Sequence, residues 1–425
     1  MRAMDEPEFL KLMHMEFDHI RKRLRGMAMI SRGIVPKVVL SRRAVDRMLS
    51  AANQFTADET GEAMVGFVVE DDTPEGLPTI YVLDTISPDE TAVRRSHTFQ
   101  QGDAQQDEII WWLQENWHFH RERHRGTDAL PARFDVPLRY LGDWHKQPGS
   151  MIQPSHGDHM TALSWLDDEE SGMDFLLVPI VTLGHLPNIG ETDLTVNYIN
   201  VPMENGRVMR VDWWYVHRDV RVFQPVHPKV VPDDQLPQMM KYSWHVVNPE
   251  RLYIETAALE DDGHLVRRLL YECDGEVPLE YCFFMIRQGS SFFLLFVTQY
   301  DYPQSPPKAF QAPFVDGLDL MDPVETFHKL WAVREPIEDP PGWEWSAGKY
   351  LFQYVIAIEV DMGLRPPTSV SIPVLIEEGD VSMNDGRDAA TAKIVSETDT
   401  EAEEMDQSAA DERTVAEEKT GGEAQ

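Results

Sequence analysis

The spacing of hydrophobic positions predicts that helices and strands are interspersed over residues 38–225. Apolar side chains recur at helical spacing over Arg42–Ala52, where Ser41 is a candidate N-cap, and again over Asp107–Arg123 and Asp158–Leu166. Short runs rich in Val, Ile and Tyr predict strands at Ala63–Val69, Thr79–Ile86, Leu138–Trp144, Phe175–Thr182, Leu194–Val201 and Arg207–Val216. Helices and strands mixed in this order predict an α/β (α+β) layered domain.

The flanking segments have different patterns. Residues 1–37 have apolar positions at helical spacing and predict a helical leader, whereas the Pro-rich residues 226–247 predict a linker. A second α+β domain is expected at residues 248–363. Its predicted elements are a helix at Gly263–Glu272, a hairpin of strands Glu280–Arg287 and Ser291–Val297 joined at Gln288-Gly289, and a helix at Ser346–Ile358.

Charge narrows the range of partners. The chain has 73 acidic and 38 basic residues and a net charge of −35. Residues 377–425 hold 16 acids and 4 bases without an aromatic residue, so this tail is expected to be disordered. The rest is also acidic and repels phosphate backbones, so nucleic acid is not an expected partner and protein partners are favoured.

The chain shows no sign of export or membrane insertion. It contains no run of about 18 apolar residues, and residues 1–25 lack the apolar core of a signal peptide. The two cysteines, Cys273 and Cys282, lack zinc-ribbon spacing and are expected to be reduced thiols. We therefore expect a cytoplasmic protein that does not contact membranes.

Candidate chemistry gathers around the strand predicted to end near Trp144. His145 and Gln147 are two positions apart and share a side of that strand, and Pro148 then breaks it. Asp158, near a helix start, adds a carboxylate, and a catalytic zinc site typically takes three protein ligands. Ser155 can donate a hydrogen bond to a developing oxyanion, and Glu59 can move a proton.

This spacing resembles the JAMM metallopeptidases of the JAB/MPN superfamily. Their signature is an upstream Glu, then His-x-His-Pro, six residues, Ser, two residues and Asp; Glu59, His145, Pro148, Ser155 and Asp158 fall in register. The segment Glu59-Thr60-Gly61 with Gly66 is similar to the family's Glu-Thr-Gly-Gly-x-Leu-x-Gly strand. The resemblance covers roughly residues 38–185.

The resemblance implies a Zn²⁺-dependent isopeptidase or peptidase that acts on ubiquitin or a ubiquitin-like protein. It assigns Glu59 as general acid/base, His145 and Asp158 as metal ligands, and Ser155 as the oxyanion donor. Gln147 stands where the family has its second His ligand. An amide oxygen is a weak zinc ligand beside imidazole. A non-catalytic scaffold or a ubiquitin-like-binding protein with a degenerate metal site therefore remains the alternative.

Nearby side chains offer substitutes for the missing ligand. His156 and His159 flank Asp158, but solvent-facing positions are the simpler interpretation for both. Glu62 is expected to be structural, since alternation directs it to the strand face opposite Glu59. His120 and His124 are four residues apart on the same predicted helix, where a polar helix end is favoured over a metal site.

The second domain resembles ubiquitin-conjugating enzymes. Its Tyr302-Pro303-x-x-Pro306-Pro307-Lys308-Ala309-Phe310 segment is similar to their Tyr-Pro-x-x-Pro-Pro-Lys pattern, and Trp345-Ser346 is similar to their later Trp-Ser-Pro element. Such enzymes need a cysteine nucleophile between the two, and residues 311–344 contain none. The resemblance thus implies a binding module without conjugating activity. An unrelated α+β domain with a Pro-rich turn remains the alternative.

Overall fold

The computed structural model has a mixed α/β architecture. Its described residues are 35–366, except 72, 74–75, 102–103, 170 and 187–195. Most of the predicted leader and the whole predicted acidic tail lie outside them. In this described part no helix combines the length and apolarity that a membrane crossing requires.

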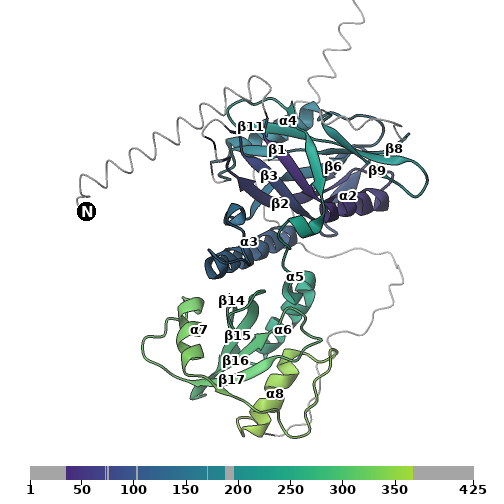
Figure 1. Ribbon diagram of the computed structural model, residues 1–425. Coiled ribbons are helices and arrows are strands. Elements are labelled where there is room, and N and C mark those ends of the chain that lie inside the picture. The colour runs from purple at the N-terminus through teal and green to yellow at the C-terminus, as the bar shows by residue number, and fades with distance from the viewer. Residues whose placement is uncertain are drawn as a thin grey trace, which may run out of the picture. The chain divides into compact units, whose positions relative to one another are not determined.

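Residues 35–236, here called the first region, are built on an eight-stranded sheet with the order β13-β1-β3-β2-β6-β8-β10-β9. Strand β6 lies between β2, to which it is antiparallel, and β8, to which it is parallel (Figure 1). The strands are β1 Lys37–Ser41, β2 Thr60–Val69, β3 Thr79–Ile86, β6 Arg139–Lys146, β8 Ile180–His185, β9 Tyr198–Pro202, β10 Val208–Asp212 and β13 Pro228–Val231. Strand β13 falls within the segment predicted to be a linker and pairs in parallel with β1.

Two helices cover opposite faces of this sheet. Helix α2 (Arg42–Gln54) packs on the face that carries Met64, and α3 (Ala104–His124) packs on the face that carries Val65. The two faces follow from the alternation of side chains along β2. Ser41 caps α2 by accepting a hydrogen bond from Ala44 N, so this predicted N-cap is confirmed.

Smaller elements complete the first region. Helix α4 (His156–Asp167) packs against a three-stranded sheet of β12, β11 and β7. The other elements are the hairpin β4 Val93–Arg95 and β5 Thr98–Gln100, β7 Phe175–Leu177, β11 Trp214–His217, β12 Gln224–Pro225, and the single-turn helices η1 Ala132–Phe134 and η2 Asp233–Gln235.

Two strands predicted as continuous are each divided between sheets. The predicted strand Phe175–Thr182 is β7 followed by β8, because Pro179 has no N–H for a ladder and the chain changes sheets there. The predicted strand Arg207–Val216 likewise becomes β10 and β11. Between them, Trp213 continues both registers: its N–H donates to Asn197 O beyond β9–β10, and its O accepts from Val226 N beyond β11–β12, while its side chain is buried.

Residues 244–366, here called the second region, form a separate five-stranded antiparallel sheet in chain order. Its strands are β14 His264–Tyr271, β15 Glu280–Arg287, β16 Phe292–Thr298, β17 Lys308–Pro313 and β18 Glu335–Pro336. Helices α6 (Pro249–Asp261) and α8 (Leu351–Asp361) contribute to the core on one sheet face, and α7 (Pro323–Ala332) packs on the other (Figure 1). A short helix, α5 (Trp244–Val247), precedes α6.

One element of the second region differs in kind from its prediction. The helix predicted at Gly263–Glu272 is wrong, because all eight residues of β14 pair with β15. The helix lies earlier, where Asn248 caps α6 and Pro249 occupies its first turn. The hairpin of β15 and β16 is confirmed. The last helix begins at Leu351 instead of Ser346, after a turn at residues 347–348.

Candidate active-site cleft

Alternation along β6 directs three polar side chains toward one cleft. Asp143, His145 and Gln147 line it, whereas Trp144 and Lys146 are buried on the other side of the strand. The strand predicted to end at Trp144, with His145 at its end, extends to Lys146, so His145 lies within β6. Its N–H donates to Pro179 O at 3.1 Å, and the N–H of Gln147 donates to Val181 O at 2.9 Å. These bonds fix the backbone that presents both side chains.

The start of α4 holds Asp158 in place. Ser155 is its N-cap and accepts a hydrogen bond from Asp158 N at 3.2 Å. In return, Asp158 Oδ2 accepts from Ser155 N at 2.6 Å. The Ser-x-x-Asp spacing is therefore a capping box, in which two backbone donors at the helix start are satisfied reciprocally. Ser155 lines the cleft, and its hydroxyl hydrogen has no acceptor among the described residues.

His145, Gln147 and Asp158 converge at distances that suit a metal ion. His145 Nε2 lies 3.5 Å from Asp158 Oδ1, and Gln147 Nε2 lies 3.3 Å from His145 Nε2 and 3.4 Å from Asp158 Oδ2. Tetrahedral zinc with bonds of about 2.0–2.2 Å sets neighbouring ligand atoms about 3.3–3.6 Å apart. Among the described residues, the buried Gln147 Oε1 has no hydrogen-bond partner. A half-turn of this amide brings that oxygen to the converging side.

Glu59 reaches the same cleft from the start of β2. Its N–H donates to Arg95 O at 2.8 Å, and the register that pairs Thr60 with Lys146 continues to set Glu59 opposite Gln147. Gly61 permits the close approach of the β4–β5 hairpin to β2 near Glu59. A Cβ there would lie 2.2 Å from Trp144 O and 2.7 Å from the Phe99 ring. The small residue thus lets the β4–β5 hairpin lie against β2.

The cleft has a volume of about 640 Å³ and contains all the predicted site residues: Glu59, His145, Gln147, Ser155 and Asp158. Its remaining described lining is mostly apolar or neutral and includes no Lys or Arg. Lys146 is directed elsewhere and donates to Phe55 O. The cleft therefore concentrates carboxylates, which favours cations or cationic groups of a substrate.

Burial tunes the acid–base groups of the cleft. It raises the pKa of Glu59, and the negative charge of Asp158 raises it further, while His97 and Lys146 oppose both effects. Burial lowers the pKa of His145 despite the neighbouring Asp158 charge. His145 is thus favoured in the neutral form that binds metals, and Glu59 is poised to exchange a proton nearer neutrality than an ordinary carboxylate.

Two charged or chargeable side chains of the cleft, Asp143 and His97, were not among the predicted site residues. Asp143 faces the cleft two positions before His145, and the alternation that paired His145 with Gln147 contained the signal for it. Burial raises the pKa of Asp143 to about 6, although hydrogen bonds from Tyr140 and Gln101 oppose this shift. His97 belongs to the turn of the β4–β5 hairpin, for which the hydrophobic pattern gave no signal.

The candidate substitute ligands lie outside the cleft lining. His156 is exposed, and His159 Nε2 lies 2.9 Å from Arg221 O. Glu62 is buried and accepts hydrogen bonds from Thr85 at 2.5 Å and from Trp144 at 3.3 Å, in agreement with a structural role.

In the part of the chain that the structure describes, the histidines of α3 are not part of a metal-binding group with carboxylates. Their rings lie close together, with 4.5 Å between the centroids of His120 and His124. His120 also stacks on Trp117. Burial lowers the pKa of His120, and the neighbouring His124 lowers it further.

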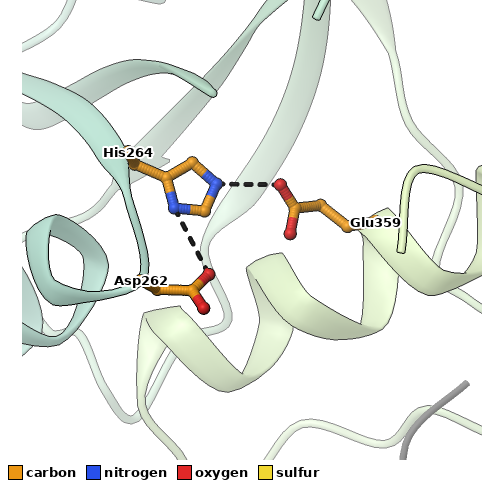
Figure 2. A group of neighbouring side chains, drawn as sticks. All are labelled: Asp262, His264 and Glu359. Carbon is orange, nitrogen blue, oxygen red and sulfur yellow. Dashed lines mark hydrogen bonds and ion pairs between the residues drawn. The ribbon is translucent and has the colours of Figure 1, made fainter. Parts of the chain in front are cut away.

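A second histidine–carboxylate cluster lies in the second region. Asp262, His264 and Glu359 have metal-ligand spacing and are the one group of three such residues found in the described part of the chain (Figure 2). His264 Nε2 lies 2.8 Å from Glu359 Oε1, and its Nδ1 lies 3.5 Å from Asp262 Oδ2. Two arginines, Arg287 and Arg365, form ion pairs with both carboxylates.

The arginines dominate the charge of this cluster. Burial acts to raise the pKa of Glu359, but hydrogen bonds from His264 and Arg287 outweigh it and lower the pKa to about 2. A metal ion would have to displace these guanidinium groups, since they already neutralise the carboxylates. The cluster links the end of α6, strands β14 and β15, and α8.

In the second region, the Tyr302-Pro303 segment and the Trp345-Ser346 element, both similar to ubiquitin-conjugating enzymes in sequence, contact each other. Trp345 Nε1 donates to Pro303 O at 2.9 Å, and the rings of Tyr302 and Trp345 lie 5.6 Å apart. The Sγ atoms of Cys273 and Cys282 lie 3.5 Å apart as free thiols. Burial raises the pKa of Cys282 well above its ordinary value, which disfavours a reactive thiolate.

Comparison with known proteins gives limited likenesses. No protein-family model matches the sequence. A protein named CD-NTase/cGAS isopeptidase, from Enterobacter hormaechei subsp. hoffmannii (strain UCI 50), is 26% identical over 145 residues. The match covers 34% of this chain and 66% of that relative, just under two thirds of its length.

One solved structure matches part of the chain, but the similarity is too low to support a fold or a function. It is the solution structure of protein DSY2949 from Desulfitobacterium hafniense, which is 13% identical and matches 46% of this chain and 92% of its own. The TM-score of this match is 0.25.

Proposed function

We propose that the chain is a metal-dependent isopeptidase that removes or processes a ubiquitin-like modifier, and that a JAB/MPN-like domain at residues 38–225 holds its active site. The observation that carries the proposal is the convergence of His145, Gln147 and Asp158 at ligand spacing in a cleft that also contains Glu59. The name of the Enterobacter relative supports general isopeptidase chemistry.

His145, Asp158 and the amide oxygen of Gln147 would hold the metal ion. Zinc, when bound, would supply a Lewis acid that polarises the scissile carbonyl group. The convergence fits such an ion, and the unpartnered Gln147 Oε1 supplies an oxygen for the third position. Because an amide oxygen binds zinc more weakly than an imidazole, the affinity is lower than with two histidines.

The chain's own groups perform the proton transfers. Glu59, with its raised pKa, accepts a proton from the attacking water and returns it to the leaving amine. The half-buried Ser155 hydroxyl donates to the developing oxyanion. Asp158 is held by the capping box, so its free oxygen stays directed at His145.

A probe peptide tests this proposal. It carries a C-terminal Gly-Gly joined to the side-chain amine of a lysine, and its cleavage by the full chain is followed with added Zn²⁺. We expect slow cleavage that Gln147→His accelerates and Glu59→Gln abolishes. His156→Ala, which changes an exposed histidine beside the capping box, is the matched control for His145→Ala.

A non-catalytic scaffold is the second candidate. Gln147 Nε2 lies within hydrogen-bond distance of both His145 Nε2 and Asp158 Oδ2. An amide in this orientation satisfies both groups without an ion. If Gln147→His neither binds zinc nor cleaves the probe, the scaffold is favoured and the isopeptidase proposal is rejected.

For residues 248–363 we propose a binding module similar to ubiquitin-conjugating enzymes but without their activity. Residues 226–247 join it to the rest of the chain, although β13 within them belongs to the sheet of the first region. The contact between Pro303 and Trp345 supports the resemblance. The absence of Cys from residues 311–344 supports the loss of conjugating activity.

The expected partners of this module are a ubiquitin-like protein or its conjugates, in the cytoplasm. Titration of the full chain with ubiquitin tests this; no binding by wild type, or equal binding by Trp345→Ala, contradicts it.

A further inference from the structure

Asp143, a lining residue of the cleft, has a buried acceptor oxygen without a partner in the described part of the chain. Its side chain lines the cleft on the same side of β6 as His145 and Gln147. Tyr140 and Gln101 hydrogen-bond to the carboxylate, yet its buried Oδ1 has no partner among the described residues. An unpaired buried carboxylate oxygen is costly, so a donor brought by a ligand would be stabilising there.

The walls beside Asp143 are apolar and aromatic. Trp165 stacks on Tyr140 with 5.7 Å between the ring centroids, and its side chain is 46% exposed. Leu176 and Val178 line the same cleft. Such walls suit the methylene stem of a long side chain, and the aromatic faces also attract a cationic head.

The charge of the cleft also favours a cationic side chain of the substrate. Among the residues that the structure describes, Glu59, Asp143 and Asp158 are its carboxylates, and neither Lys nor Arg lines it. Asp158 would be occupied by a metal ion and Glu59 by proton transfer. Asp143 is then the carboxylate left to recognise a substrate.

We propose that Asp143 is a specificity residue that binds a lysine or arginine side chain of the substrate next to the scissile bond. The inference rests on the proposed isopeptidase function for the position of that bond. The cationic head pairs with the Asp143 carboxylate, and the stem lies against Tyr140 and Trp165. The cation belongs either to the modifier's tail, on the acyl side, or to the target protein, on the amine side.

Binding to the full-length Glu59→Gln variant tests the proposal without turnover. The probes are Gly-Gly–lysine isopeptides that carry one arginine on the acyl side or on the amine side, each matched by a citrulline probe. Isothermal titration in the presence of Zn²⁺ gives their affinities. We expect one arginine probe to bind about tenfold more tightly than its citrulline partner, as a desolvated charge pair allows. The side that shows the preference identifies the source of the cation.

Substitutions then test whether Asp143 causes the preference for arginine over citrulline. Asp143→Asn should remove it, whereas Asp58→Asn, which deletes an equal charge next to Glu59 but outside the cleft lining, should keep it. Tyr140→Phe deletes a hydrogen bond to Asp143 but keeps its charge, and should also keep the preference. Retention by folded Asp143→Asn, loss in Tyr140→Phe, or no arginine preference in the parent variant overturns the proposal.

Failure of this inference is distinguishable from failure of the proposed function. If wild type cleaves no probe but the Asp143-dependent preference is measured, the cationic subsite stands and the isopeptidase proposal fails. If wild type cleaves the probes and Asp143→Asn keeps the preference, the subsite fails and the isopeptidase proposal stands.

Discussion

The two histidine–carboxylate clusters of this chain differ in what surrounds them. In the first region, His145 and Asp158 line an open cleft beside the amide oxygen of Gln147. In the described part of the chain, this cleft has no Lys or Arg in its lining and the oxygen has no partner. In the second region, His264 and Glu359 are buried and paired with arginines. Both clusters have metal-ligand spacing, so spacing does not separate them.

Charge balance separates the clusters. Guanidinium groups supply the second cluster with the positive charge that an ion would bring, whereas the described lining of the first cluster has no such groups. Ion pairs that connect α6, β14, β15 and α8 have a clear structural use. A metal is therefore expected at the cleft, although its third ligand is the unusual Gln147.

The largest expected effect is on hydrolysis. Glu59→Gln should reduce probe cleavage by about 10²–10⁴-fold, because the amide cannot accept a proton from water. In wild type, the raised pKa of Glu59 moves the acidic limb of the pH–rate profile above the ordinary value of 4.5. Equal cleavage by Glu59→Gln and Asp58→Asn would contradict this role.

The second cluster should respond in stability instead. Glu359→Gln leaves His264 and Arg287 without their carboxylate partner and should lower the free energy of unfolding by about 3 kcal/mol. Urea denaturation measures this change, with exposed Glu338→Gln as the control. Because the folded pKa of Glu359 is lowered from 4.5 to about 2, its contribution is complete above 4.5 and lost as pH falls to about 2. A difference from wild type that stays constant across this window would argue against the ion-pair account.

Gln147→His should strengthen metal binding by at least about tenfold. Even changes to residues that only contact the ligands alter metal affinity by about tenfold or more, and this substitution changes a ligand itself. The imidazole replaces a weak amide ligand and leaves the ion pairs of Glu359 untouched. Competition with a zinc-sensitive dye measures the affinity, and His156→Ala serves as the control. An unchanged affinity would mean that the amide position is not part of a metal site.

Ser155→Ala should have the smallest effect on stability, about 1 kcal/mol, because it removes the N-cap of α4. Thermal unfolding measures this loss. Ser155→Thr keeps a hydroxyl cap and should restore most of the stability. If Ser155→Ala unfolds like wild type, the capping box does not hold Asp158 as described.

The sequence was most informative where local signals agreed with the tertiary environment. The helix after Ser41 and the β15–β16 hairpin follow from a cap, a turn and an apolar period. Strand β14 was mistaken for a helix because the Leu-Val-Arg-Arg-Leu-Leu run of residues 265–270 fits both periods, and pairing with β15 decides the outcome. Division of the strand at Pro179 depends on which sheet each half joins.

The candidate site was predictable as far as its motif extended. Glu59, His145, Gln147, Ser155 and Asp158 line one cleft, although their chemical roles stay predictions. His97 was missed because its hairpin has no hydrophobic signal. The Arg287–Glu359 pair was also missed, because its partners are 72 residues apart and nothing local relates them.

Metal content tests the central claim most directly. Elemental mass spectrometry of the purified full chain after dialysis with zinc should find about one ion per chain, as a mononuclear site requires. His145→Ala should lose the ion, and a folded His264→Ala should retain it. An ion that is retained in His145→Ala but lost in His264→Ala, or no ion in wild type, would contradict the account.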